Sequence, residues 1–344
     1  MTLSVQQVLR VAMTARPVRR LWAPFMRGRG TIFFLHRFSD PDLGVVGHDP
    51  ALLHRALAYL RRERYELVDL VDLFGRLRRA DSRVDRAVAF TMDDGYLDQA
   101  TVGGEVFAHF DCPVTTFVTT AFLDGMDWMW WDRIEYVFDH TARPTLEITF
   151  ENEALRYVRA PAMGYEAAQA DFTERCKTVP NASRVRAIQA LAAAAEVEVP
   201  VKPPLRYAPL TWSQARALER RGMRFGPHTV THPILSRTSP LQSEREIADS
   251  WQRVQAEVSE PVSIFCYPNG QSQDFGSRET TTLRTLGFAG AVVGSTGYAT
   301  SEAFAAAPDG PFRVQRFGYP DDLRRVAQCA SGLDRVNQLL RGYR

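Results

Sequence analysis

Two adjacent carboxylates, Asp93 and Asp94, stand in the stretch Thr91-Met92-Asp93-Asp94-Gly95, directly after the apolar run 87–90. That run predicts a buried strand, and Gly95 permits a chain reversal because glycine tolerates positive φ. Successive side chains of a strand point to opposite faces, so both carboxylates reach one site only if the strand ends here and the backbone turns. Two neighbouring acids repel each other unless a cation or different protonation states relieve the repulsion. If a cation relieves this repulsion, its other ligands must stand elsewhere in the chain.

His228 and His232 are the strongest candidates for such ligands, in the stretch His228-Thr229-Val230-Thr231-His232-Pro233. In a single helical turn the i, i+4 spacing places both imidazoles on one side, where they can share a metal, and Pro233 would end that turn. An isolated HxxxH is a weak signal, but a strand-terminal acid pair in the same chain strengthens it. Two imidazoles, one carboxylate and an open position form a catalytic zinc arrangement. Such a metal lowers the pKa of a bound water toward about 7, and the second carboxylate stays free to act as a base.

The elements that must position these residues form a regular alternation of strands and helices, which predicts parallel βαβ units. The expected strands are the runs 31–35, 87–90 (with the acid pair at its end), 114–118, 223–226, 262–266, 290–293 and 312–315. This number of strands favours closure into a barrel, in which chemistry gathers at the C-terminal ends of the strands. The candidate residues all follow such ends: His36, Asp93, Asp94, His228 and Tyr267.

Two segments depart from this rhythm. Residues 1–30 read as a basic, amphipathic helical lead-in to a barrel domain at 31–344. Residues 123–205 read as a helical insertion or cap, which opens with Trp128, Trp130 and Trp131. These aromatic side chains either stack on sugar rings in a substrate cleft or pack the insertion itself.

Composition excludes several classes of protein. A net charge of +2 with scattered arginines gives no sign of nucleic-acid binding. The four cysteines form no CxxC pair, which argues against a thiolate zinc site and for free thiols. The absence of a G-x-S-x-G elbow and of a P-loop argues against a serine hydrolase and a nucleotide triphosphatase.

The N-terminus has no continuous apolar stretch of the kind found in signal peptides, and no run is long enough to span a membrane. We therefore expect a cytoplasmic protein. The basic start could also attach it peripherally to an anionic membrane surface, although a solvated flank is the simpler alternative.

The motifs resemble those of the NodB-type polysaccharide deacetylases, carbohydrate esterase family four. The family's T-F-D-D-G motif is matched by residues 91–95, and its H-[ST]-x-x-H motif by His228, Thr229 and His232. The resemblance covers about 31–120 and 206–320. It implies a distorted (β/α) barrel of about seven strands, with Asp93 as general base and with Asp94, His228 and His232 as metal ligands. It also implies a divalent metal, with Zn²⁺ expected among the ions that this ligand set accepts.

The chain departs from the family pattern at two places. The third motif, R-x-x-P-Y, is matched loosely by 265–270, where Tyr267 could offer its backbone N–H to an oxyanion, but the arginine is absent. We expect Arg316 on the last strand to replace it and orient Asp93. No histidine follows His232, so the family's Leu-x-His motif is also missing. Some relatives that act on exopolysaccharides carry a histidine on an N-terminal strand instead, and His36 fits that subgroup as general acid, against the alternative of a structural histidine.

The function that the resemblance implies is metal-dependent hydrolysis of N-acetyl groups, less readily O-acetyl groups, on amino sugars of a polysaccharide or glycan precursor. Two alternatives stay open at this stage. One is a hydrolase of the same chemistry acting on a small amide. The other is a glycan-binding relative that has kept the fold and lost turnover, which the missing arginine and relocated histidine motivate.

Overall fold

The computed structural model describes residues 23–333 and 335 of the 344-residue chain. Most of the predicted lead-in, 1–22, lies outside the described residues, as do 334 and 336–344. What is described of the lead-in is a 3-10 helix, η1 (Ala23–Met26), followed by the start of β1 at Arg29. In the described part of the chain, no helix combines the length and apolar character needed to cross a membrane.

The centre of the molecule is a nearly closed barrel of parallel strands, which confirms the predicted fold class. Its strands follow the order β7-β4-β3-β1-β11-β9-β8. Their bounds are β1 (Arg29–Leu35), β3 (Ala87–Asp94), β4 (Val114–Val118), β7 (Arg224–Pro227), β8 (Ile264–Cys266), β9 (Gly290–Thr296) and β11 (Val314–Gly318). The two end strands of this order lie side by side: the N–H of Val262, just before β8, donates to the carbonyl of Phe225 in β7 over 2.8 Å. Two short strands lie beside this path, β2 (Glu66–Leu67) against β3 and β10 (Ala299–Thr300) against β1.

Strand β3 lies between β1 and β4, and all of its residues are buried. A continuous apolar run of this kind is typical of parallel strands covered on both faces. In the parallel register Met92 lies opposite Leu35 of β1, and Asp94 lies opposite Val118 of β4. The C-terminal ends of the three strands therefore meet at one edge, where the site residues are found.

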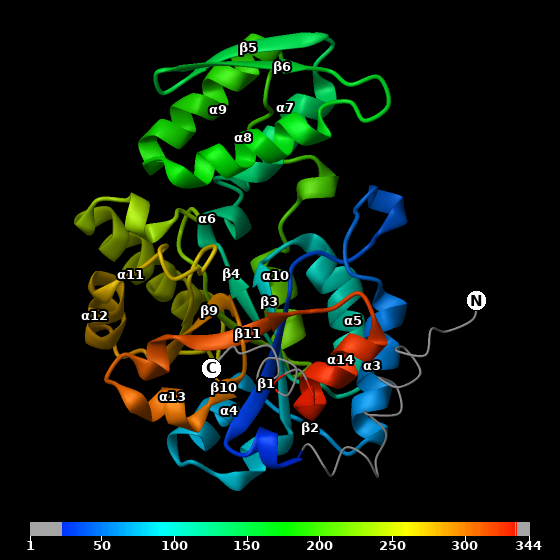
Figure 1. Ribbon diagram of the computed structural model, residues 1–344, viewed down its shortest axis with the longest axis vertical. Coiled ribbons are helices and arrows are strands. Elements are labelled where there is room, and N and C mark those ends of the chain that lie inside the picture. Colours follow the sequence, from blue (N-terminus) through cyan, green and yellow to red (C-terminus); the bar gives the residue numbers. More distant parts are fainter. Residues whose placement is uncertain (1–22, 334, 336–344) are drawn as a thin grey trace.

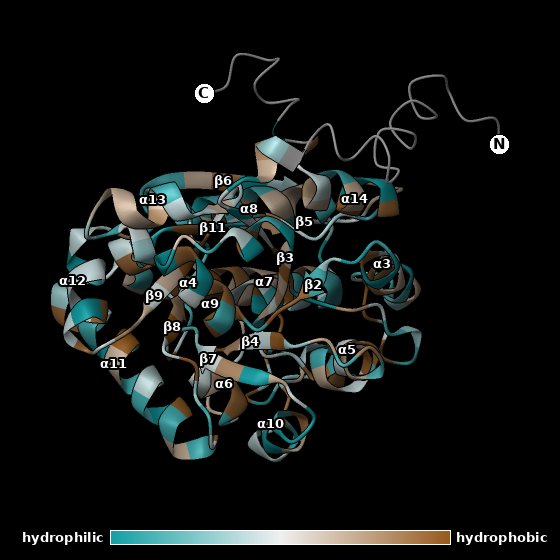
Figure 2. Ribbon diagram, turned by 90° about the horizontal axis from the view of Figure 1, so that it is seen from below, coloured by the Kyte–Doolittle hydropathy of each residue, from teal (hydrophilic) through white to brown (hydrophobic). Residues whose placement is uncertain are grey.

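Helices surround the strands (Figure 2). They are α3 (Pro50–Arg62), α4 (Leu70–Arg78), α5 (Gly104–His109), α6 (Thr120–Leu123), α10 (Trp212–Glu219), α11 (Pro240–Glu257), α12 (Ser277–Thr285), α13 (Ser301–Ala306) and α14 (Leu323–Ser331). In α3 the residues Leu52, Leu53, Ala56, Leu57 and Leu60 recur at helical spacing and are buried, which is why this segment packs against the barrel.

A separate group of elements, here called the cap, lies at one end of the barrel (Figure 1, green). It comprises α7 (Trp130–His140), β5 (Thr145–Phe150), β6 (Glu153–Val158), α8 (Glu166–Thr178) and α9 (Asn181–Ala195). The cap has a hydrophobic core of its own. The insertion is thus not purely helical: β5 and β6 form an antiparallel hairpin, because Leu146, Ile148 and Phe150 alternate with exposed residues. The cap elements fall within 123–205, whose boundaries as a domain stay a prediction.

Candidate active site

The end of β3 brings both carboxylates to one place by a turn that begins at the second of them. Asp94 has φ +85° and Gly95 has φ +93°. At Gly95 an added Cβ would lie 2.7 Å from Cδ1 of Leu123, so both the conformation and the space require glycine. Asp94 is a non-glycine residue in the left-handed region. This backbone conformation costs free energy and is found preferentially at functional sites.

Asp93 is paired with Arg316 of β11 in a buried, bidentate contact. Nη1 of Arg316 donates to Oδ1 of Asp93, and Nη2 donates to Oδ2, each over 2.8 Å. The guanidinium is fixed further by bonds to Oγ1 of Thr91 and the carbonyl of Val293. Burial raises the pKa of Asp93, but the charge and hydrogen bonds of Arg316 outweigh this and hold it well below the ordinary value. Asp93 is therefore a carboxylate at any working pH.

Asp94, His228 and His232 bring three potential ligand atoms together. Oδ1 of Asp94 lies 3.6 Å from Nε2 of His228 and 3.5 Å from Nε2 of His232. The two Nε2 atoms are 3.1 Å apart. Ligands at 2.0–2.1 Å from a tetrahedral ion lie about 3.3 Å from one another. The spacing of these three atoms therefore fits a divalent metal with nitrogen and oxygen ligands.

The protonation of this triad also fits a cation site. Burial, followed by the charges of Asp93 and Asp132, raises the pKa of Asp94 well above its ordinary value. Burial lowers the pKa of His228 to about 4, and it lowers the pKa of His232 well below the ordinary range. The imidazoles are thus neutral and able to ligate, and a positive charge among them would restore Asp94 to its ionised form.

His228 is oriented by the strand next to it. Its Nδ1–H donates to the carbonyl of Cys266 over 2.7 Å, which leaves the lone pair of Nε2 directed at Asp94 and His232. The expected helical turn at 228–232 is wrong. The segment is a loop in which Thr229 and His232 have φ +67° and +53°, and Oγ1 of Thr229 accepts the N–H of His232 over 3.0 Å.

Glu246 of α11 holds this loop in place, a role that the sequence did not reveal. Its Oε2 accepts the N–H groups of Val230 and Thr231 over 2.8 and 2.9 Å, and its Oε1 accepts the hydroxyl of Thr231. Ser243 and Glu246 have the spacing of a capping box, but α11 begins earlier with Ser239 as its N-cap, so both residues lie within the helix. Glu246 is buried on the inner face of this helix, which only the structure shows.

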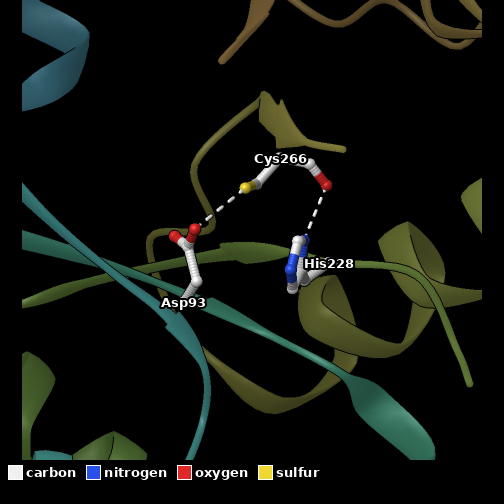
Figure 3. Close-up of side chains that lie close together, drawn as sticks. All are labelled: Asp93, His228 and Cys266. Carbon is white, nitrogen blue, oxygen red and sulfur yellow. Dashed lines mark hydrogen bonds between the residues drawn. The ribbon is translucent and has the colours of Figure 1, made fainter. Parts of the chain in front are cut away.

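A second group of potential ligands, Asp93, His228 and Cys266, lies beside the first. Figure 3 shows the Cys266 thiol facing Asp93 and the Cys266 carbonyl facing His228. Both oxygens of Asp93 are occupied by Arg316, and burial raises the pKa of the Cys266 thiol well above its ordinary value. In this group the Cys266 thiol is neutral and the Asp93 carboxylate is already paired with Arg316. The group is therefore less suited to bind a metal than the triad of Asp94, His228 and His232. All four cysteines are free thiols, as expected.

The remaining predicted site residues line the same cavity as the triad. His36 follows β1 with an exposed side chain, and desolvation by the surrounding protein lowers its pKa, against the charge of Asp93. Tyr267 follows β8, and its backbone N–H lies 3.4 Å from the carbonyl of Val292, a long hydrogen bond. Gln99, which the sequence reasoning missed, donates its amide to the carbonyls of His36 and Asp93 and so ties the ends of β1 and β3 together.

The cavity measures about 820 Å³ and lies between the barrel and the cap. On the barrel side it contains the triad, Asp93, His36 and Arg316. On the cap side it is lined by α7 and by one face of α8: Glu166, Gln169, Ala170, Thr173, Glu174 and Lys177. Trp130 and Trp131 line the cavity, whereas Trp128 is packed in the hydrophobic core beside the barrel.

Comparison with known proteins identifies the family. The family model described as polysaccharide deacetylase matches residues 80–290, which include Asp93, Asp94, His228 and His232. The chain belongs to the polysaccharide deacetylase family. It is accordingly a hydrolase of carbon–nitrogen bonds that acts on an acetylated glycan. A search of curated protein sequences gave no match.

Solved structures of polysaccharide deacetylases share the fold at low sequence identity. The Streptococcus pyogenes deacetylase PplD in complex with acetate has a TM-score of 0.54 and 16% identity, over 86% of this chain and 93% of that one. IcaB from Ammonifex degensii has a TM-score of 0.52 and 15% identity, over 89% and 98%. The polysaccharide deacetylase BA0330 of Bacillus anthracis has a TM-score of 0.54 and 13% identity, over 88% and 69%.

Proposed function

We propose that this protein is a metal-dependent deacetylase that hydrolyses N-acetyl groups of amino sugars in a polysaccharide or glycan precursor. The observation that carries the proposal is the triad of Asp94, His228 and His232 beside the ion pair of Asp93 and Arg316, in one cavity. Asp94, His228 and His232 would hold a divalent ion, most simply Zn²⁺. When bound, that ion would polarise the acetyl carbonyl and lower the pKa of a water molecule.

Asp93 is the base in this proposal. Its carboxylate is ionised because Arg316 depresses its pKa, and the fork of Arg316 fixes its plane. It accepts the proton of the attacking water, while the backbone N–H of Tyr267 would exchange its long bond to Val292 for the oxyanion.

His36 is the acid in this proposal, which places the chain in the subgroup with a histidine on an N-terminal strand. Its lowered pKa means that the imidazole is neutral in the resting enzyme. It must therefore take up a proton during the cycle before donating it to the leaving amine.

The size and walls of the cavity favour a glycan over a small amide. About 820 Å³ is far more than one acetamide fills, and the aromatic rings of Trp131 and Tyr207 can stack on sugar faces. The experiment is a substrate screen for acetate release, comparing N-acetylated oligosaccharides with N-alkyl acetamides, before and after chelation. Chelator-sensitive release from oligosaccharides is expected. Acetate release only from small amides would overturn the assignment of a glycan substrate. Binding of oligosaccharides without acetate release would favour a catalytically inactive relative.

His228→Ala tests the ligand set in the same assay. Loss of bound metal together with activity is expected, because one of three ligands is gone. A variant that retains its full metal content would remove His228 from the set.

A further inference from the structure

A second cavity, of about 680 Å³, shares the wall formed by Trp130 with the first. It lies between the cap and the barrel, and it is lined by α9, by the segment 126–133 and by the loop 199–201. On the barrel side its wall includes Thr231 and Glu246, which belong to the support of the His228–His232 loop. The mechanism proposed above makes no use of this space.

Arg184 of α9 lines this cavity as a buried cation that makes no direct ion pair with an acid of the described residues. Its side chain is 4% exposed, and it donates a hydrogen bond to Oδ1 of Asn181. Its Nε has no hydrogen-bond partner, and among the described residues Arg184 forms no ion pair with a carboxylate; Glu246 acts on it only through its charge. The guanidinium stacks over Trp130, 4.6 Å from the ring centre. Burial lowers the pKa of Arg184 to about 10, so it remains charged at neutral pH.

The acidic groups that line the cavity are already engaged. Asp127 forms an ion pair with Arg133. Glu246 accepts three hydrogen bonds from Val230 and Thr231. A buried charge is costly unless it is paired, so the guanidinium of Arg184 is a strong candidate to receive an anion from outside the chain.

The position of Arg184 in its helix adds to this attraction. Helix α9 begins at Asn181, and within the described structure no side chain caps its first turn. The N–H groups of a helix start, together with the helix dipole, favour an anion. Arg184 stands in that first turn, so the two attractions act on one place.

The rim of the same cavity is apolar and exposed. Met126 is 79% exposed, Val185 47% and Val201 87%, and all three line the cavity. Exposed apolar side chains that gather at one opening mark a binding surface. We propose that this cavity binds an amphiphilic oxyanion, whose carboxylate or phosphate pairs with Arg184 at the start of α9 and whose apolar chain lies along Met126, Val185 and Val201.

The test is calorimetric titration of the full chain with octyl phosphate and octanoate, beside octanol and inorganic phosphate. We expect both octyl anions to bind at least about tenfold more tightly than octanol or inorganic phosphate, since each control lacks one of the two attractions. A preference for octyl phosphate over octanoate would assign the site to phosphate esters, and equal binding would assign it to carboxylates as well.

Two variants and one control variant distinguish binding in this cavity from nonspecific binding to the protein surface. Arg184→Gln should weaken binding of octyl phosphate by about tenfold or more, whereas Arg186→Gln, on the exposed side of the same helix, should leave it unchanged. Val201→Asp changes an exposed rim residue without disturbing the fold, and should also weaken binding. The proposal is overturned if octanol binds as tightly as octyl phosphate, or if Val201→Asp and a folded Arg184→Gln protein both bind like the wild type.

Discussion

At the scale of single residues, the contact between Arg316 and Asp93 sets the electrostatics of the site. Two parallel hydrogen bonds of 2.8 Å fix the carboxylate and depress its pKa. Lysine cannot reproduce this fork, because an ammonium group is a point charge without a planar pair of donors.

Arg316→Lys should therefore lower the rate of acetate release by about 10²-fold while metal content stays unchanged, since positioning rather than ligation is lost. The pKa of Asp93 should rise toward its ordinary value. The acid limb of the pH–rate profile should then move to higher pH, because Asp93 must be ionised to act as a base. Arg313→Lys, an exposed arginine just before β11, is the matched control. An unshifted acid limb and an unchanged rate would contradict the positioning role.

Asp132 provides a pH-dependent test of burial next to the site. Burial raises its pKa to about 7, against a hydrogen bond from the hydroxyl of Tyr96. Between pH 4 and 7 the Asp132 carboxyl loses its proton in the unfolded chain but keeps it in the folded chain. The contribution of Asp132 to the free energy of unfolding therefore becomes less favourable as the pH rises. Asp132→Asn should stabilise the metal-free protein at pH 7.5 by up to about 4 kcal/mol, with the gain vanishing near pH 4.

Urea unfolding at pH 4.5 and pH 7.5 measures this difference. Asp139→Asn, an exposed acid on the same helix, is the matched control. A gain for Asp132→Asn that is equal at both pH values would show that the carboxyl is not held protonated.

At the scale of elements, the loop 228–232 depends on α11. The carboxylate of Glu246 satisfies two backbone N–H groups and one hydroxyl of that loop. Glu246→Gln places an amide N–H₂ against donors, so it should destabilise the protein by about 1–3 kcal/mol and weaken metal binding by about 10–100-fold. Metal titration and unfolding of Glu246→Gln beside Glu244→Gln, an exposed glutamate of α11, measure both effects. Equal metal affinity in the two variants would rule out this support.

The barrel and the ends of its strands could be predicted because parallel strands leave apolar runs that are readable in sequence. The pairing of Arg316 with Asp93 was expected because the family's motif arginine is absent here, and the two side chains are in contact. The roles of Glu246 and Gln99 could not be predicted. Each bonds to backbone groups of a remote segment, and such contacts leave no spacing in the sequence. The i, i+4 spacing of the histidines suggested a helical turn. The left-handed conformations of Thr229 and His232 could not be predicted, because their residue types do not indicate them.

At the scale of the whole molecule, the cap closes one side of the catalytic cavity. A polar face of α8 lies across it from the triad. Ala170 stands on that face, whereas Ala167 stands on the same helix, is exposed and does not line the cavity.

Ala170→Trp should fill part of the cavity and lower kcat/KM for an oligosaccharide by about tenfold or more, the equivalent of 1.4 kcal/mol. Metal content should not change, because the triad belongs to the barrel. Ala167→Trp should behave like the wild type in both assays. If the two tryptophan variants have the same kcat/KM, α8 does not contact the substrate.

The central claim is that the adjacent acids divide two tasks, with Asp94 holding a metal and Asp93 acting as a base outside the ligand set. The most direct measurement is the metal content and the rate of acetate release of Asp93→Asn in one preparation. We predict full metal content with a rate lowered by about 10²–10⁴-fold, as expected for the loss of a general base. An Asp93→Asn protein that keeps its metal and its full activity would contradict the claim.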